Sequence, residues 1–151
     1  MDRPYDYDTD THAWALEQAD ALRRRAASEV DWDHVAEEIE SVGKQQVCEL
    51  RNRLVVLIAH LLKWIVRPEQ RSRSWRLTIV EQRRALAVHI ADNPSLNAKL
   101  DQAFCDAFGI AVAVAARETD LDEDAFPGEP PFSVDQALDS AWWPDGEKQS
   151  E

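Results

Sequence analysis

The sequence predicts an all-α fold: a single-domain helical bundle of four to five main helices with an irregular, proline-rich C-terminal segment. Apolar residues recur at helical spacing through most of the chain, alternation with a period of two is essentially absent, and there are only 4 glycines. A length of 151 residues suits one hydrophobic core. We therefore expect one domain over 1–151, with an ordered core over about 9–144 and a mobile tail over 145–151.

Two helices are expected in the N-terminal third. The first begins after a capping residue within 9–11 and continues to about Ala27. The second begins near residues 31–33 and reaches Gly43, which would cost about 1 kcal/mol relative to alanine inside a helix and therefore marks a plausible end or bend. Its apolar residues recur at i, i+4 and i+7: Val35, Ile39 and Val42.

A central helix is expected from Lys44 to about Val66. The stretch from Val55 to Leu62 is apolar on nearly every face, which is typical of a helix surrounded by other helices. Pro68 ends this helix, because proline lacks an amide donor and disfavours helical geometry in the residue before it.

Two more long helices and a short one complete the bundle. One is capped by Ser72 or Ser74 and stops near Asn93, and the next runs from about Asn97 to Arg117. An acidic stretch and a proline-rich stretch then exclude regular helix until a short helix over 134–139. The tryptophan pair at 142–143 is expected to pack back onto the bundle, because a free tail would not normally carry so much apolar area.

Composition narrows the function classes. The net charge of −12 disfavours general affinity for nucleic acids or anionic membranes. The most apolar run, Leu54–Val66, is shorter than the roughly 18 residues of a membrane span. Cys48 and Cys105 show no C-x-x-C pattern, so neither a disulfide framework nor a zinc site is suggested. We expect a cytoplasmic, acidic protein without a cofactor or bound metal, and the sequence leaves its oligomeric state open.

Charge is distributed unevenly along the chain. Residues 1–50 sum to −8, residues 51–90 to +7 and residues 91–151 to −11. The basic segment either faces its own acidic flanks, since attraction at contact range survives salt, or faces an anionic ligand such as a phosphate.

Several motifs in the middle of the chain are long and distinctive. They are Asp31-Trp32, Ala36-Glu37-Glu38-Ile39-Glu40-Ser41 with Gly43, Leu61-Leu62-Lys63-Trp64, Arg71-Ser72-Arg73-Ser74-Trp75-Arg76 and Glu81-Gln82-Arg83-Arg84. Through them the sequence resembles the bacterial helical family known as domain of unknown function number twenty-nine, and the resemblance covers nearly the whole chain. It implies a small, all-helical, intracellular bacterial protein, and it implies no activity or catalytic residue.

A polar stripe runs along the expected central helix. His60 has apolar neighbours and needs a hydrogen-bonding partner, for which Glu37 or Glu40 is the obvious candidate. His60 is either a satisfied core histidine or a group for proton transfer or metal binding. The two glutamates could join it around a divalent cation, but the chain lacks the Glu-x-x-His pair of helical metal sites, so we assign no metal. The stripe comprises Glu49, Arg53, His60 and Trp64.

The run from Arg71 to Arg76 joins guanidinium groups, hydroxyls and the free amides of a helix start, an arrangement that suits a phosphate or another anion. The structural alternative is that the serine caps, the tryptophan fills the core and the arginines pair with the glutamates of 37–40. The run contributes Arg71, Arg73, Ser74, Trp75 and Arg76, and Gln82 follows on the same stripe as Trp75.

The leading functional hypothesis is an interaction or regulatory module, built around a polar Glu/Arg/His centre that takes a protein partner. The alternative is a small helical-bundle enzyme, a metal-dependent hydrolase or a ribonuclease, using the same centre. The spacing of Arg53 and His60 is similar to the Arg-x4-6-His motif of small helical-bundle ribonucleases, although Leu54 stands where those enzymes place a polar residue. No Ser-His-Asp or Cys-His signature is present, so no catalytic residue is assigned.

Overall fold

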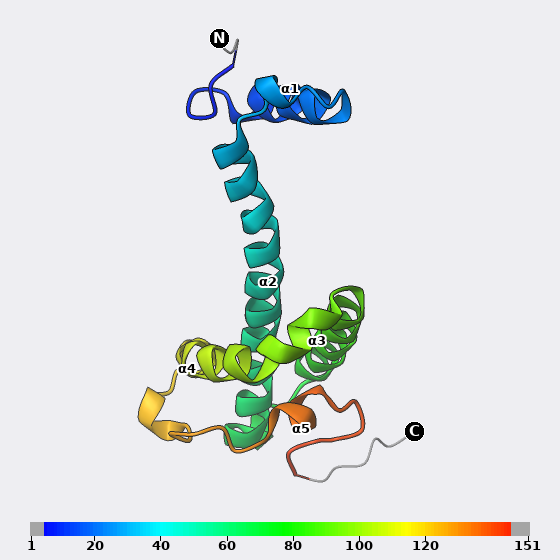
Figure 1. The fold of residues 1–151 in the computed structure, drawn as a ribbon. Helices are drawn as coiled ribbons and strands as arrows, with labels where there is room; N and C mark the ends of the chain where they lie inside the picture. Colours follow the sequence, from blue (N-terminus) through cyan, green and yellow to red (C-terminus); the bar gives the residue numbers. More distant parts are fainter. Residues whose placement is uncertain (1–4, 146–151) are drawn as a thin grey trace. The chain divides into compact units, whose positions relative to one another are not determined.

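The computed structural model describes residues 5–145, and this part of the chain is helical without strands (Figure 1). The expected all-α class is confirmed. Short 3-10 turns connect the helices at Ala27–Glu29, Pro68–Gln70, Pro94–Lys99 and Glu123–Ala125. The α-helices are α1 (Thr11–Arg23), α2 (Trp32–Val66), α3 (Arg73–Asp92), α4 (Leu100–Thr119) and α5 (Val134–Leu138). Apart from Asp145, the tail expected at 145–151 lies outside the described residues.

Contacts between residues divide the chain into two units. Unit 1 is Met1–Gln45 and unit 2 is Gln46–Glu151. The boundary falls within α2, so unit 1 holds α1 with the first part of α2, and unit 2 holds the remainder of α2 with α3, α4 and α5. The single-domain organisation expected from length stays a prediction.

Side-chain caps begin three of the helices. Asp10 caps α1, Ser72 caps α3 and Ser133 caps α5, and in each case the side-chain oxygen accepts a hydrogen bond from the backbone N–H three residues later. At α5 the side chain of Gln136 also accepts from the Ser133 N–H, which completes a capping box. Of the two serines expected to cap α3, Ser72 does so.

The helix break expected at Gly43 is wrong. Helix α2 is continuous over 35 residues and joins the two helices that the sequence had separated. A single glycine costs only about 1 kcal/mol, and the intact hydrogen-bond ladder on both sides outweighs that cost. A Cβ at Gly43 would meet nothing within 4 Å, so no close packing requires glycine there.

Two other helix boundaries also shift. The first helix ends at Arg23 rather than Ala27, and Arg25 adopts a left-handed backbone with φ of 59°. The fourth begins at Leu100 rather than Asn97, because a 3-10 turn occupies 94–99. It ends at Thr119, where Asp120 is left-handed with φ of 57°.

The core of unit 2 surrounds the second part of α2, as the apolar stretch predicted. Side chains of α3 and α4 pack with it in one cluster. Figure 1 shows these two helices beside the second part of α2. Alanines on α4 allow the close approach. Trp143 is 3% exposed and joins this cluster, and the half-buried Trp142 packs against it, so the expected packing of both C-terminal tryptophans is confirmed. Fully buried side chains include Leu50, Leu54, Leu57, Ile58, Leu61, Leu62, Ile79 and Leu86.

Candidate functional site

The candidate residues fall in different units. Glu37 and Glu40 lie in unit 1 with exposed side chains, and neither is ion-paired within the described part of the chain. The other ten belong to unit 2. The partner of His60 also differs from expectation. Its Nδ1 donates to the backbone oxygen of Val56 at 2.8 Å, because a histidine reaches the free lone pair of the carbonyl one turn back on its own helix.

A buried lysine organises the polar contacts next to His60. Lys63 is 4% exposed, and its Nζ donates to Oε2 of Glu118 at 2.6 Å and to Nε2 of His60 at 3.4 Å. The same ammonium lies 4.7 Å from the centre of the Trp75 ring. Because the lysine donates to Nε2 and Nδ1 donates elsewhere, His60 is the neutral Nδ1–H tautomer.

Two arginines lie over a pair of tryptophans in contact with each other. Trp64 and Trp143 lie 4.9 Å apart between ring centres. The guanidinium of Arg71 lies 4.9 Å from the Trp64 ring, and that of Arg76 lies 5.0 Å from the Trp143 ring. The Nε of Arg71 donates to the Trp64 carbonyl at 2.8 Å, and its Nη1 forms an ion pair with Asp145. Both indole N–H groups are buried without a hydrogen-bond partner in the described structure.

Arg83 is the most deeply placed guanidinium, at 4% exposed. Its Nε donates to the carbonyl of Ala137 at 2.8 Å and its Nη2 to that of Gln136 at 3.4 Å, so the arginine bonds two carbonyls in the last turn of α5. Its Nη1 is buried and finds no hydrogen-bond partner within residues 5–145. Burial lowers the pKa of this guanidinium, and the charge of Asp139 offsets part of that effect.

A cleft of about 700 Å³ opens beside Arg83. Arg84 and Ser140 add polar groups to its wall, and the remaining wall is apolar. The cleft therefore combines a desolvated cation, an exposed cation and hydrocarbon, a combination found in binding sites for small ligands. Its lining residues are Val80, Arg83, Arg84, Ala87, Leu138, Ser140 and Ala141.

The remaining candidates are spread over the surface of unit 2. Glu49 and Arg53 form the expected ion pair at 3.0 Å, and Glu49 also lies 3.7 Å from Nδ1 of His89. Arg53 and His60 thus have separate partners, so their spacing gains no support as a ribonuclease motif. Arg73 and Ser74 are exposed on the first turn of α3, whereas the Oε1 of Gln82 is buried without a partner among the described residues.

No group of three metal-ligating side chains occurs within residues 5–145. In the same range, none of the helices has the length and apolar character needed to cross a bilayer.

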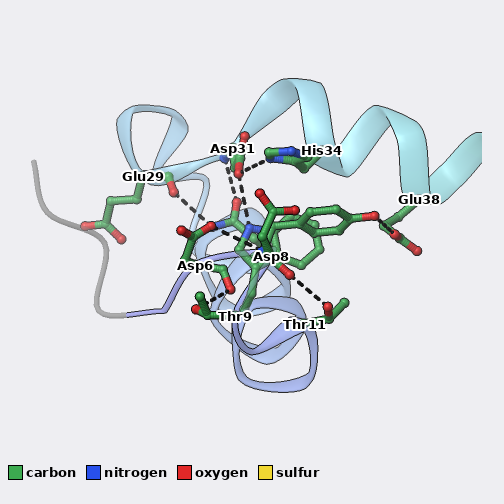
Figure 2. A network of polar contacts seen from close by, with 11 residues as sticks. Asp6, Asp8, Thr9, Thr11, Glu29, Asp31, His34 and Glu38 are labelled. Atoms are coloured by element: carbon green, nitrogen blue, oxygen red, sulfur yellow. Dashed lines mark hydrogen bonds and ion pairs between the residues drawn. The ribbon is translucent and has the colours of Figure 1, made fainter.

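Unit 1 has its own polar network, centred on Asp31 (Figure 2). The Oδ2 of Asp31 accepts from the indole N–H of Trp14 at 3.2 Å and from Nδ1 of His34 at 2.8 Å. The backbone N–H of Asp31 donates to the side chain of Gln18 at 2.6 Å. These bonds tie α1 to the start of α2, and the hydrogen bond to Asp31 raises the pKa of His34.

Tyr7 closes this network. Its ring stacks on His34 with ring centres 4.2 Å apart, and its hydroxyl donates to Oε1 of Glu38 (Figure 2). The hydrogen bond to that carboxylate raises the pKa of Tyr7 to about 12. Beyond Trp14, unit 1 buries few apolar side chains, so this network provides much of its order.

The middle of the chain carried the family resemblance, and comparison with known families tests it. A family model described as domain of unknown function DUF29 matches residues 7–143. The chain belongs to the DUF29 family. No curated protein and no solved structure matches it. The DUF29 description names no activity.

Sequence reasoning missed several residues of this DUF29 chain that the structure makes central. Lys63, Arg83 and Trp143 were not proposed for the site, and neither was Glu118. The signal for Arg83 was present, because it lies at i+4 from Ile79 and therefore on the buried stripe of α3. The signal for Lys63 was its place in an apolar run. Nothing local pointed to Glu118, whose partner lies 55 positions away.

The His60 contacts predict how acid affects unit 2 of the DUF29 chain. Burial and the Lys63 charge lower the pKa of His60 below its ordinary value of 6.5. As the pH falls below about 6.5, the unfolded chain therefore binds a proton that the folded chain resists, and stability decreases. We expect urea unfolding of His60→Gln to show a weaker loss of stability between pH 7 and pH 5 than wild type.

The pH dependence of wild-type stability alone does not isolate His60, because His34 changes stability with pH in the opposite direction. The comparison with His60→Gln removes the contribution of His34, which is the same in both proteins. Its raised pKa adds stability at low pH that is lost as the pH rises through its folded value. Glu118 acts at more acidic pH. Lys63 lowers the pKa of that carboxyl, so its contribution is lost only below its ordinary value of 4.5. Identical slopes for both proteins would contradict the assignment to His60.

Proposed function

We propose that unit 2 is a regulatory interaction module that binds an acidic group, a phosphate or carboxylate, in the cleft beside Arg83. One observation carries the proposal: the wall of an open cleft holds two arginines, Arg83 and Arg84, and no carboxylate, and the Nη1 of Arg83 lacks a hydrogen-bond partner within residues 5–145. A buried donor without an acceptor costs free energy, and an anion in the cleft would recover it once the Arg83 side chain turns its Nη1 toward the cleft.

The electrostatics of Arg83 support an anionic ligand. No carboxylate lies within 4.0 Å of its guanidinium in the described structure, and its other bonds go to neutral carbonyls. Asp139 acts on this guanidinium only from beyond that distance, so a bound anion would supply the counter-charge in direct contact that a desolvated cation needs. Arg84, exposed on the cleft wall, provides a second cation, and charge-assisted hydrogen bonds to two guanidinium groups are strong.

The proposal moves the anion site along α3 from the position expected at Arg71–Arg76. Arg71 already bonds the Trp64 carbonyl and Asp145, and Arg76 lies over Trp143. Ser72 uses its hydroxyl to cap the helix. Arg71 and Ser72 thus use their polar groups within the protein. Arg83 also lies over Trp143, but its Nη1 has no hydrogen-bond partner within residues 5–145.

Thermal melting in the presence of inorganic phosphate tests the function. We expect the wild-type melting temperature to rise with phosphate, because a ligand that binds only the folded state stabilises it, by about 2.7 kcal/mol at a concentration 100 times the Kd. Arg84→Gln should keep the melting temperature of the unliganded protein, since the side chain is exposed, and should lose most of the phosphate-induced rise.

Arg73→Gln is the matched control, because Arg73 is an exposed arginine of the same helix that does not line the cleft. It should keep the full phosphate response. The proposal fails if sodium chloride at equal ionic strength raises the melting temperature as much as phosphate does, or if Arg84→Gln and Arg73→Gln respond alike.

A further inference from the structure

We infer that the apolar groove between α1 and the first part of α2 in unit 1 is a docking site for an amphipathic helix of a partner protein, one whose apolar stripe is flanked by lysine or arginine. The inference does not depend on the anion site, because it uses different residues in the other unit.

The groove exposes apolar side chains that sequence periodicity predicted to be packed. Its volume is about 300 Å³. Ile39 is 67% exposed and Val42 58%, and Leu22 on the facing wall is 41% exposed. The α1 wall consists of Thr11, Trp14, Ala15, Gln18, Ala19 and Leu22, and the α2 wall of Val35, Glu38, Ile39 and Val42.

The shape of the groove favours a helix as occupant. Each wall presents mostly apolar residues at helical spacing, which is the kind of surface that accepts the i, i+3, i+4 and i+7 side chains of an amphipathic helix. The walls are held in place by the network around Asp31 (Figure 2). Asp31 forms hydrogen bonds with Trp14 and Gln18 of α1 and directly precedes α2. The groove is therefore pre-formed, which lowers the entropic cost of docking.

The negative charge of unit 1 favours a partner helix with basic residues on either side of its apolar stripe. Residues 5–45 contain 11 acidic and 4 basic side chains. Three of the basic residues are consecutive, at 23–25, and Arg24 among them is already ion-paired with Asp20 and Glu29. On the groove wall, Glu38 carries a carboxylate that accepts from Tyr7. The resulting negative field attracts a basic helix.

The same charge argues against a second copy of this chain as the occupant. A symmetric dimer through the groove would place two strongly acidic units against each other, and like-charge contacts across an interface cost free energy. A basic partner instead gains both the apolar contact and the attraction.

Fluorescence anisotropy with a designed peptide tests the inference on the full chain. The probe is a labelled helix of about 18 residues with leucine at i, i+3, i+4 and i+7 and lysine on its flanks. The control peptide keeps the leucines and carries glutamate in place of lysine. We expect the lysine peptide to bind at least about tenfold more tightly, with an affinity that falls as salt is added.

Matched variants locate the binding. Ile39→Gln should weaken the lysine peptide about tenfold without changing the melting temperature, because the side chain is 67% exposed. Leu16→Gln is the control, since Leu16 is 62% exposed on α1 but outside the groove, and it should leave affinity unchanged.

Three results would overturn the inference. They are equal binding of the two peptides, equal effects of the two substitutions, and a wild-type dimer in sedimentation that Ile39→Gln converts to monomer. The last would assign the groove to a second copy.

Discussion

Replacing Trp143 with alanine is expected to lower the free energy of unfolding by about 3–5 kcal/mol, in the range for deleting a buried tryptophan. The side chain is 3% exposed and packs against Trp64. It also faces the guanidinium groups of Arg76 and Arg83, at 5.0 and 5.4 Å from its ring centre. Truncation would leave a cavity and remove both cation–π contacts at once. Urea denaturation followed by tryptophan fluorescence measures the loss.

Trp32→Ala provides the comparison for the same chemical change at an exposed position. Trp32 is 58% exposed, so its loss should cost less than about 1 kcal/mol. If the two substitutions cost the same, Trp143 does not anchor the C-terminal segment to the core of unit 2.

Lys63→Ala is expected to cost about 3 kcal/mol. The lysine side chain is 5% exposed, whereas that of Glu118 is 38% exposed. Removing the ammonium therefore strands a carboxylate that water partly reaches, which places the cost toward the lower end of the range for breaking a buried pair. The buried stem of the lysine and its contact with Trp75 are lost as well.

Arg53→Ala separates burial from charge. Arg53 also belongs to α2 and also forms an ion pair, with Glu49, but the two side chains are 35% and 44% exposed. Its removal should cost less than about 1 kcal/mol, since exposed pairs contribute little. Urea unfolding of both variants at the same pH gives the comparison, and a Lys63→Ala cost as small as that of Arg53→Ala would show that the Glu118 pair is not effectively desolvated.

The sequence predicted most of the helices correctly, because helix caps, proline stops and apolar periodicity each depend on residues that are close together in the chain. Pro68 ends α2, Ser72 caps α3, and the apolar run of 55–62 lies in the core. The helix end or bend predicted at Gly43 was wrong, because the glycine cost of about 1 kcal/mol is too small to end a helix when the residues on both sides favour helix. The family resemblance was confirmed over residues 7–143.

The candidate site was only partly predictable from sequence. The Glu49–Arg53 pair followed from spacing on one helix and is present. The partners of Lys63 and Arg83 lie 55 and 54 positions away, so no helical spacing relates them. The polar residue expected to find a distant glutamate, His60, instead bonds the carbonyl one turn earlier.

By itself, the sequence determined the helical class, the burial of the second part of α2 and, to within two or three residues, the caps of α1 and α3, because hydrophobic periodicity and capping act within a few residues. Only the tertiary structure decided which buried cation forms an ion pair with a carboxylate. Lys63 is paired with Glu118. Arg83 donates to two backbone carbonyls, and its Nη1 has no hydrogen-bond partner within residues 5–145. The physical reason is that the desolvation of a charge depends on every element packed around it, and that packing exists only in the folded chain.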